Sequence, residues 1–251
     1  MKPQHRNSLV LLGSWYLVLG TFFSDCKKEH MLDLFKSTGD ITTEVRDLSP
    51  FTEIWIGNNK INIIITQANK YQVEVSAGSH LIRSITTEVR DGKLYIENEN
   101  KCNFVRSYKK EITVHVYMPM LLNIYHDGSG KITGTNDLTA DTIDIITKSA
   151  GDVELLLNCY LVRTHLHSCA DITLTGTCHD HLCYATGNGF FNGENLSSDY
   201  TWVFAKTTGD IHVRVASLFI VDIESIGDVY YSGSPPFIQQ ELNGSGKLIP
   251  Q

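Results

Sequence analysis

A unit of about twenty residues recurs through the second half of the sequence, and this period constrains the fold more than any other feature. Each unit carries a small residue, followed two positions later by an apolar one. The small residues lie 18 to 21 positions apart and are Gly130, Gly151, Ala170, Gly189, Gly209, Gly227 and Gly246. Their apolar partners are Ile132, Val153, Ile172, Phe191, Ile211, Val229 and Leu248. Because one unit cannot bury its apolar face alone, we expect the units to stack around a shared core.

Apolar side chains also alternate within each unit, as in strands that turn one face inward. Phe219, Val221 and Ile223 show this spacing in one unit. The sequence therefore predicts an all-β, parallel β-helix-like solenoid with rungs of ~19–20 residues, two short strands in each rung, and glycines whose positive φ permits tight corners. A leucine-rich horseshoe needs a leucine and asparagine ladder that is absent here, and a propeller blade needs about twice this length. Another repetitive all-β form remains the alternative.

The first half reads as ordinary strands, with the expected segments at 53–56, 61–66, 71–75, 85–90, 93–97 and 112–117. Asp91-Gly92 is a strong signal for a two-residue hairpin, so part of this region should pair antiparallel. We expect an N-terminal β segment over residues 49–126, continuous with a solenoid over 127–251. The β segment is expected to cap the solenoid, whose end would otherwise expose unpaired strand edges.

The N-terminus has the pattern of an export signal. Lys2, His5 and Arg6 precede an apolar run from Leu9 to Phe23, which is short for a membrane span. Cys26 follows directly, which predicts a lipoprotein-type signal peptide over residues 1–25, lipidation of Cys26 and a tether over residues 26–48. Asp25 departs from the pattern, because such signals prefer a small residue there; a secretory signal or a retained anchor are the alternatives. The expected location is the cell envelope, outer-membrane-anchored and facing either the periplasm or the surface.

These residues resemble a known family over roughly residues 40–250. The resemblance lies in the recurring Gly-Asp and Ser-Gly units and in four N-terminal motifs, which are Pro50-Phe51-Thr52-Glu53-Ile54, Tyr71-Gln72-Val73-Glu74-Val75, Ile85-Thr86-Thr87-Glu88-Val89 and Asp91-Gly92-Lys93-Leu94-Tyr95-Ile96. The sequence is similar to the putative auto-transporter adhesin, head GIN domain family of envelope lipoproteins. The resemblance implies a right-handed β-helical fold, exposure in the periplasm or on the surface, and no known catalytic residues.

The net charge of −7 argues against nucleic acid as a partner, because phosphate binding needs a basic face. Gly-x-Ser-x-Gly, phosphate-loop and His-Glu-x-x-His motifs are absent, and the outward acids are scattered over different units. We therefore expect a non-enzymatic adhesin or scaffold protein without a cofactor, joined to a membrane through its lipid. A carbohydrate-binding or carbohydrate-processing β-helix is the alternative.

Residues 165–183 contain the pattern most typical of a metal site, with the runs His165-Leu166-His167-Ser168-Cys169 and His179-Asp180-His181-Leu182-Cys183. The repeat register turns His165 and His167 outward, but His181 and Cys183 inward. Four ligands would then not converge on one ion, so we expect no metal. The aspartates Asp152, Asp171, Asp210 and Asp228 are likewise expected to be solvated corner residues rather than calcium ligands.

Cys159 and Cys178 each lie eight residues after a small residue of the repeat. We expect them to stack in neighbouring rungs at a spacing of ~4.8 Å, which a disulfide tolerates. They are therefore a candidate disulfide pair, with buried free thiols as the alternative.

Large apolar residues also occupy outward positions on adjacent rungs. The candidate binding patch consists of Tyr184, Tyr200, Trp202, Phe204 and Phe237, with Leu218 and Ile220 beside them. Exposed aromatic groups that gather in this way mark an interface or a ligand platform for an unknown protein or glycan. The alternative is that another strand, the N-terminal segment or a second copy of the chain covers them.

Overall fold

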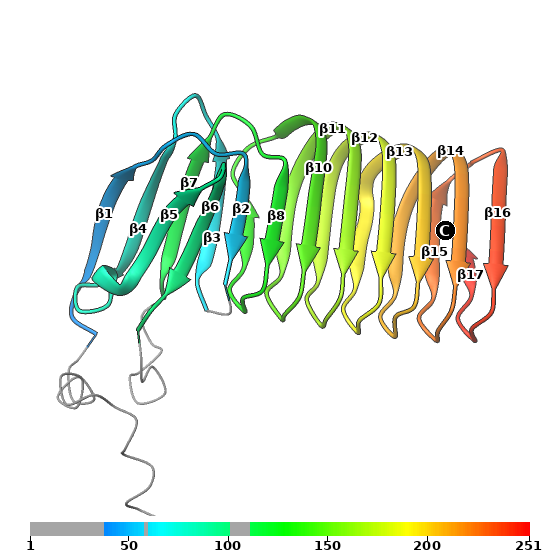
Figure 1. Ribbon diagram of the computed structural model, residues 1–251. Coiled ribbons are helices and arrows are strands. Elements are labelled where there is room, and N and C mark those ends of the chain that lie inside the picture. The colour runs from blue at the N-terminus through cyan, green and yellow to red at the C-terminus, as the bar shows by residue number, and fades with distance from the viewer. Residues whose placement is uncertain (1–37, 58–59, 101–110) are drawn as a thin grey trace, which may run out of the picture.

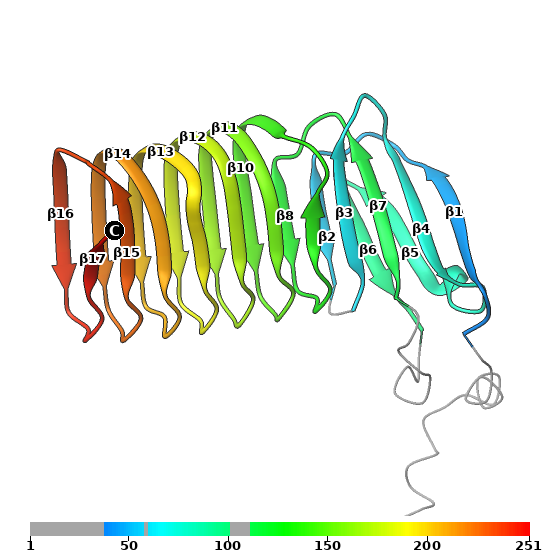
Figure 2. The ribbon, with the colours of Figure 1, turned by 180° about the vertical axis from the view of Figure 1, so that it is seen from behind.

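The computed structural model describes residues 38–57, 60–100 and 111–251. The described strands form one 17-stranded sheet that winds into a solenoid of about seven turns (Figure 1). Figures 1 and 2 show β16 and β17 at one end of the stack and β1, β4 and β5 at the other. The predicted all-β solenoid with a partly antiparallel N-terminal segment is confirmed. None of the helical structure in the described residues is long and apolar enough to cross a membrane.

The N-terminal segment contains short strands and one turn of 3₁₀ helix. Its elements are β1 Ile41–Asp47, β2 Glu53–Ile56, β3 Asn62–Gln67, β4 Gln72–Gly78, η3 Ile82–Ser84, β5 Ile85–Arg90, β6 Lys93–Asn98 and β7 Thr113–Met118. The remaining strands build the turns and are β8 Asn123–His126, β9 Ile132–Gly134, β10 Leu138–Thr147, β11 Val153–Leu166, β12 Ile172–Ala185, β13 Phe191–Ala205, β14 Ile211–Ile223, β15 Val229–Gly233, β16 Phe237–Leu242 and β17 Leu248–Pro250.

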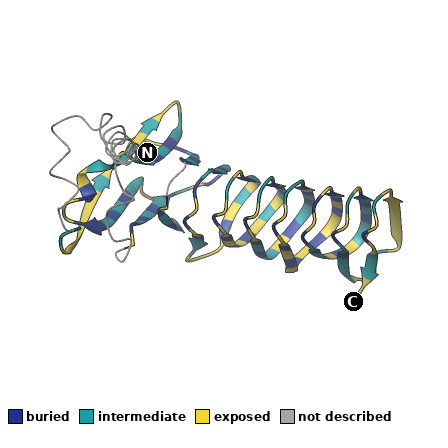
Figure 3. Ribbon diagram, turned by 90° about the horizontal axis from the view of Figure 1, so that it is seen from below, coloured by how far each residue is buried: buried dark blue, intermediate teal, exposed yellow. Residues whose placement is uncertain are grey.

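Successive turns of the solenoid pair in parallel, with register shifts in the pairings of β13 with β12 and with β14. Val153 lies opposite Ile172, and Ile172 lies opposite Phe191. All three side chains are fully buried, which places the repeated apolar position in the core. Figure 3 shows buried and exposed residues alternating along the stacked strands. The expectation of two short strands in each rung was wrong for β11–β14, which run for 13 to 15 residues through the bend between the two faces.

The N-terminal segment adds further strands to both faces of the solenoid. β2 pairs in parallel with β8, and β3 pairs in parallel with β9. β1 and β4, β4 and β7, and β5 and β6 pair antiparallel. The predicted hairpin is present between β5 and β6, with φ of 51° at Asp91 and 74° at Gly92. β1 lies within residues 26–48, so the described end of the expected tether is a paired strand.

The glycines of the repeat are needed for close approach, and the expectation of positive φ there was wrong. Positive φ among glycines occurs instead at Gly39, Gly92, Gly176 and Gly233. At Gly189 an added Cβ would collide with the carbonyl oxygen of Ala170 in the preceding turn. Neighbouring turns therefore approach too closely for a side chain at this corner.

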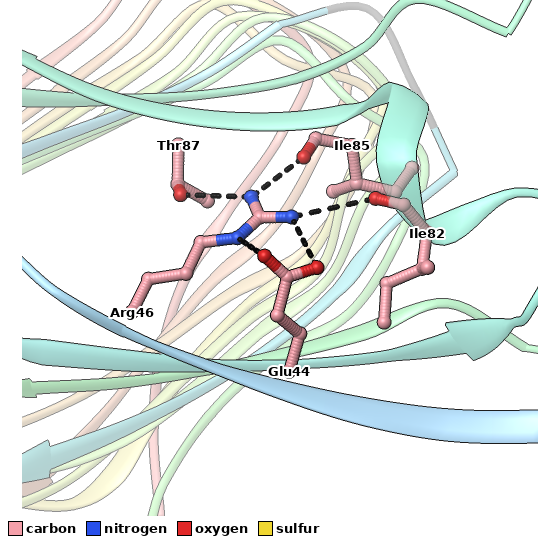
Figure 4. Close-up of polar contacts among 5 residues, drawn as sticks. All are labelled: Glu44, Arg46, Ile82, Ile85 and Thr87. Carbon is pink, nitrogen blue, oxygen red and sulfur yellow. Dashed lines mark hydrogen bonds and ion pairs between the residues drawn. The ribbon is translucent and has the colours of Figure 1, made fainter.

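The side chain of Arg46 joins the two faces at the N-terminal end of the stack (Figure 4). Its Nη1 donates hydrogen bonds to the Ile85 carbonyl oxygen at 2.7 Å and to Thr87 Oγ1 at 3.0 Å. Nη2 donates to the Ile82 carbonyl oxygen at 3.4 Å, and Glu44 accepts from the same guanidinium. β1 on one face is thereby tied to η3 and β5 on the other.

Candidate functional site

The candidate binding patch lies on the outward side of β12, β13, β14 and β16. Tyr184 on β12 is the register partner of Phe204 on β13, and Leu182 is the partner of Trp202. Tyr200 on β13 lies opposite Leu218 on β14, which in turn lies opposite Phe237 on β16. The five aromatic residues singled out in the sequence therefore share one face, because each stands at an outward position of its strand.

Most of this patch is open to solvent. The exposed fraction is 39% for Tyr184, 42% for Tyr200, 44% for Trp202 and 69% for Phe237. Phe204 is half-buried because its ring stacks on that of Tyr184, with a centroid separation of 4.9 Å and an interplanar angle of 8°. The described N-terminal strands lie toward the other end of the stack (Figure 1).

Polar groups border the aromatic side chains. The indole Nε1 of Trp202 donates a hydrogen bond to Asp222 Oδ2 at 3.1 Å, which orients the indole. Residues that lie opposite one another in successive strands form a column of side chains. In the column of Trp202, Arg163 Nη2 donates to Asp144 Oδ2 at 2.8 Å. The face thus offers both apolar surface and hydrogen-bonding groups to a ligand.

The column that contains Tyr184 and Phe204 extends much further than the sequence indicated. It continues through His165 and Ile146 to Tyr125 on β8 and then to Trp55 on β2 and Tyr95 on β6. The ring centroids of Trp55 and Tyr125 are 5.8 Å apart, and those of Trp55 and Tyr95 are 5.5 Å apart. Alternation within β2, β6 and β8 indicates that these rings point outward, but the repeat does not extend to β2 and β6 and could not align them with the column.

A second aromatic stack lies at the bend between the two faces. The His179 ring stacks on Tyr160 at 4.6 Å and contacts Tyr200 at 4.9 Å. His179 Nδ1 lies 2.8 Å from Asp180 Oδ1, which orients the imidazole. Tyr160 and His179 therefore extend the aromatic surface around the corner from Tyr200.

The His- and Cys-rich stretch is divided between the interior and the surface. His181 and Cys183 are buried, whereas His165 and His167 are half-buried on the outward side. Burial lowers the pKa of His181 to about 4 and raises the pKa of Cys183 to about 12. Within residues 38–57, 60–100 and 111–251, no three His, Cys, Asp or Glu side chains are grouped to hold a metal ion.

Cys159 on β11 and Cys178 on β12 are register partners in neighbouring turns, and both thiols are free. The candidate disulfide between them stays a prediction. Cys26, Asp25 and the signal peptide expected over residues 1–25 lie outside the described residues, as does Cys102.

The family described as "Putative auto-transporter adhesin, head GIN domain" matches residues 50–235. No curated protein matches the chain. A putative adhesin of Bacteroides fragilis NCTC 9343 is similar in structure, with 22% identity, a TM-score of 0.79 and coverage of 84% of this chain and 97% of that one.

Two proteins of Parabacteroides distasonis ATCC 8503 are also similar. One is a putative lipid binding protein, with 17% identity, a TM-score of 0.68 and coverage of 86% of this chain and 98% of that chain. The other is a putative adhesin, with 17% identity, a TM-score of 0.64 and coverage of 85% and 98%. At these identities, the three likenesses establish a common fold.

Proposed function

This chain belongs to the putative auto-transporter adhesin, head GIN domain family, and from that premise we propose that it is a non-enzymatic binding protein of the cell envelope. The observation that carries this proposal is the open aromatic patch on β12, β13, β14 and β16. Exposed apolar patches on soluble domains mark interaction surfaces, and Trp and Tyr are the side chains that contribute most to binding energy. The patch is therefore the proposed contact surface.

The proposed membrane attachment is a lipid on Cys26. The chain enters the described fold near β1, at the end of the stack opposite β16 (Figure 1). An anchor on that side would leave the patch, which reaches Phe237 on β16, toward the end away from the membrane. This arrangement suits an adhesin or scaffold, because the contact surface is presented to partners outside the membrane.

The engagement of three outward acids supports a non-enzymatic role. Asp144 is paired with Arg163, Asp222 accepts a hydrogen bond from Trp202, and Glu224 accepts one from Asn243 at 2.8 Å. General acid–base catalysis on a glycan needs two carboxyl groups free to act on one bond. Each of these three carboxylates already has a protein partner.

A carbohydrate is the favoured ligand among small partners, as a second candidate function. Trp202 offers an aromatic surface next to the Asp222 carboxylate, and the Arg163–Asp144 pair lies in the same column. This combination suits a sugar, which presents C–H groups on its ring face and hydroxyl groups at its edge. A protein partner would use the same aromatic groups as anchors.

The test is binding of the chain to arrays of purified glycans and extracellular proteins, compared with Trp202→Ala. The expected result is loss of at least tenfold in affinity for the ligand of the wild-type chain, with the melting temperature nearly unchanged. Phe190→Ala is the matched control, because Phe190 is an exposed aromatic residue outside the patch.

Two results would contradict the proposal. One is equal binding by the wild-type chain and Trp202→Ala. The other is unfolding of Trp202→Ala and of the milder Tyr184→Ala, which would assign the patch to folding. Lipidation is tested separately by lipid labelling of the exported chain, which Cys26→Ser should abolish.

A further inference from the structure

Cys159 and Cys178 form an isolated pair in one column of the solenoid. Cys159 lies opposite Ala140 on one side and Cys178 on the other, and Cys178 lies opposite Ser198 in the next turn. Neighbouring strands are about 4.8 Å apart, within the Cα separation that a disulfide accepts. The column therefore offers each of these thiols one cysteine neighbour.

Both side chains face the same way. Cys159 follows the inward positions of β11, after Leu155 and Leu157, and packs partly buried against the core. Cys178 is buried. Burial, followed by the charge of Cys159, raises the pKa of Cys178 to about 12.

The pair lies directly before the bend between the two faces. The register between β11 and β12 pairs Cys159 with Cys178 and resumes at Leu161 and Asp180. Tyr160 and His179, which follow the cysteines, stand at the bend between the two faces and are stacked on each other.

The other described cysteines lie apart from this column. Cys183 is buried in the column of Thr164 and Val203, and Cys169 is exposed in a turn. We propose that Cys159 and Cys178 are joined by a disulfide in the exported protein, which fastens one turn of the solenoid to the next.

The reaction joins the two Sγ atoms, and the two thiols lose two protons and two electrons. The electrons pass to a protein disulfide of a thiol–disulfide oxidoreductase, which is reduced to a dithiol. This step needs an oxidising compartment, and it therefore rests on the envelope location given under the proposed function. The pairing itself does not depend on the aromatic patch or on any ligand.

Burial also determines when the bond forms. Desolvation raises the pKa of Cys159 to about 11, so little reactive thiolate is present at neutral pH once the chain has folded. Oxidation is therefore expected while the turns are still forming. A chain that folds reduced should resist oxidised glutathione for hours, whereas the same chain unfolded in urea should react much faster.

The first test is disulfide mapping of the full chain after export to a bacterial periplasm. Free thiols are alkylated in denaturant without reduction, and the digested peptides are identified by mass spectrometry. The expected product is a linked peptide pair containing Cys159 and Cys178, with Cys169 and Cys183 alkylated. Alkylation of both Cys159 and Cys178, or linkage of either one to a different cysteine, would overturn the proposal.

The second test is thermal unfolding with and without a reductant. Closing one solenoid turn should raise the melting temperature of the wild-type chain by about 6 °C over its reduced form. Cys178→Ser, which introduces the residue type found at the next position of the column, should melt at the same temperature in both conditions. Cys169→Ser is the control that should keep the wild-type difference. A wild-type chain that shows no difference contradicts a bond that fastens the turns, whatever its ligand binding.

Discussion

At four corners of the solenoid, an aspartate side chain accepts a hydrogen bond from the backbone of the next turn. Asp152 Oδ1 accepts from the Asp171 N–H at 3.0 Å, and Asp171 Oδ1 accepts from the Phe190 N–H at 2.9 Å. Asp210 and Asp228 repeat the contact further along. These aspartates are therefore corner residues, as expected, and they also satisfy backbone donors that the strand ladder leaves free.

Asp171→Ala tests this contribution. The change removes a charge-assisted hydrogen bond at an exposed corner and should lower the free energy of unfolding by about 1 kcal/mol. Chemical denaturation measures the difference. Asp141→Ala is the control, since Asp141 is exposed at the bend of β10 and not at the corner that carries the repeated aspartates, and it should change stability by less than about 0.5 kcal/mol. Equal effects of the two changes would contradict the role of the corner aspartates.

His181 gives the stability a pH dependence. Its ring is buried beside Thr164 and Phe191, and burial lowers its pKa from 6.5 to about 4. Between pH 6.5 and pH 4 the unfolded chain binds the proton and the folded chain does not, so the free energy of unfolding falls as the pH falls. The loss reaches about 3 kcal/mol near pH 4.

His181→Leu should remove this part of the slope and leave the parts due to the other histidines whose pKa burial lowers, which are His115, His126, His165 and His167. Denaturation at pH 7 and pH 5 compares the two proteins. If the free energy of unfolding falls by the same amount between pH 7 and pH 5 in the wild-type chain and in the variant, His181 is not buried in its neutral form.

Residue orientation was predictable wherever the repeat supplied a register. The period placed His181 and Cys183 inside and Trp202 outside, because alternate side chains of a strand point to opposite faces. The reason why residue 189 must be glycine was not predictable, since it depends on the carbonyl oxygen of Ala170 in another turn. The local sequence contains no information on that distance.

At the scale of elements, the close stacking of neighbouring turns determines which side chains fit at the corners. Gly189→Ala should destabilise the protein by about 2 kcal/mol or more, because the new Cβ meets the Ala170 carbonyl oxygen. Gly134→Ala is the matched control, since the nearest atom to its added Cβ is a Leu155 methyl carbon at 3.4 Å. Thermal melting of both variants checks this, and a Gly189→Ala protein as stable as the control would refute the steric account.

The connection between the two faces at the N-terminal end of the stack depends on Arg46, whose side chain is 19% exposed. Arg46→Ala should lower the free energy of unfolding by about 2 kcal/mol, because the Ile85 and Ile82 carbonyl oxygens lose a charged donor. Hydrogen exchange should quicken first in β1. Arg214→Ala, at an exposed position of β14, should have little effect; comparable loosening of β1 in this control would contradict the role of Arg46.

Most N-terminal strands were predictable from alternation and turn residues, but β1 was not. Six of its seven residues are exposed, so its sequence shows no alternation of apolar and polar residues. β1 is held by pairing with β4 and by Arg46, which are both long-range contacts. An edge strand of this kind is recognised only when its partner is known.

At the scale of the whole molecule, the solenoid turns scattered aromatic residues into one surface. The sequence predicted that the five aromatic residues share an outward face, because the repeat aligned β12, β13, β14 and β16. It did not predict the extension to Trp55 and Tyr95, because β2 lies between β6 and β8 in space although it precedes both of them in the chain. That order in space arises from long-range pairing, on which the repeat carries no information.

The most direct test of the proposed contact surface is the exposure of Trp202 in the free protein. In the chain from Cys26 onward, Trp55→Phe leaves Trp202 as the remaining tryptophan. Its fluorescence should be red-shifted and readily quenched by acrylamide at every protein concentration, because the patch is open to solvent. Blue-shifted, protected emission would mean that another segment or a second copy covers the patch, and would contradict its role as a free binding surface.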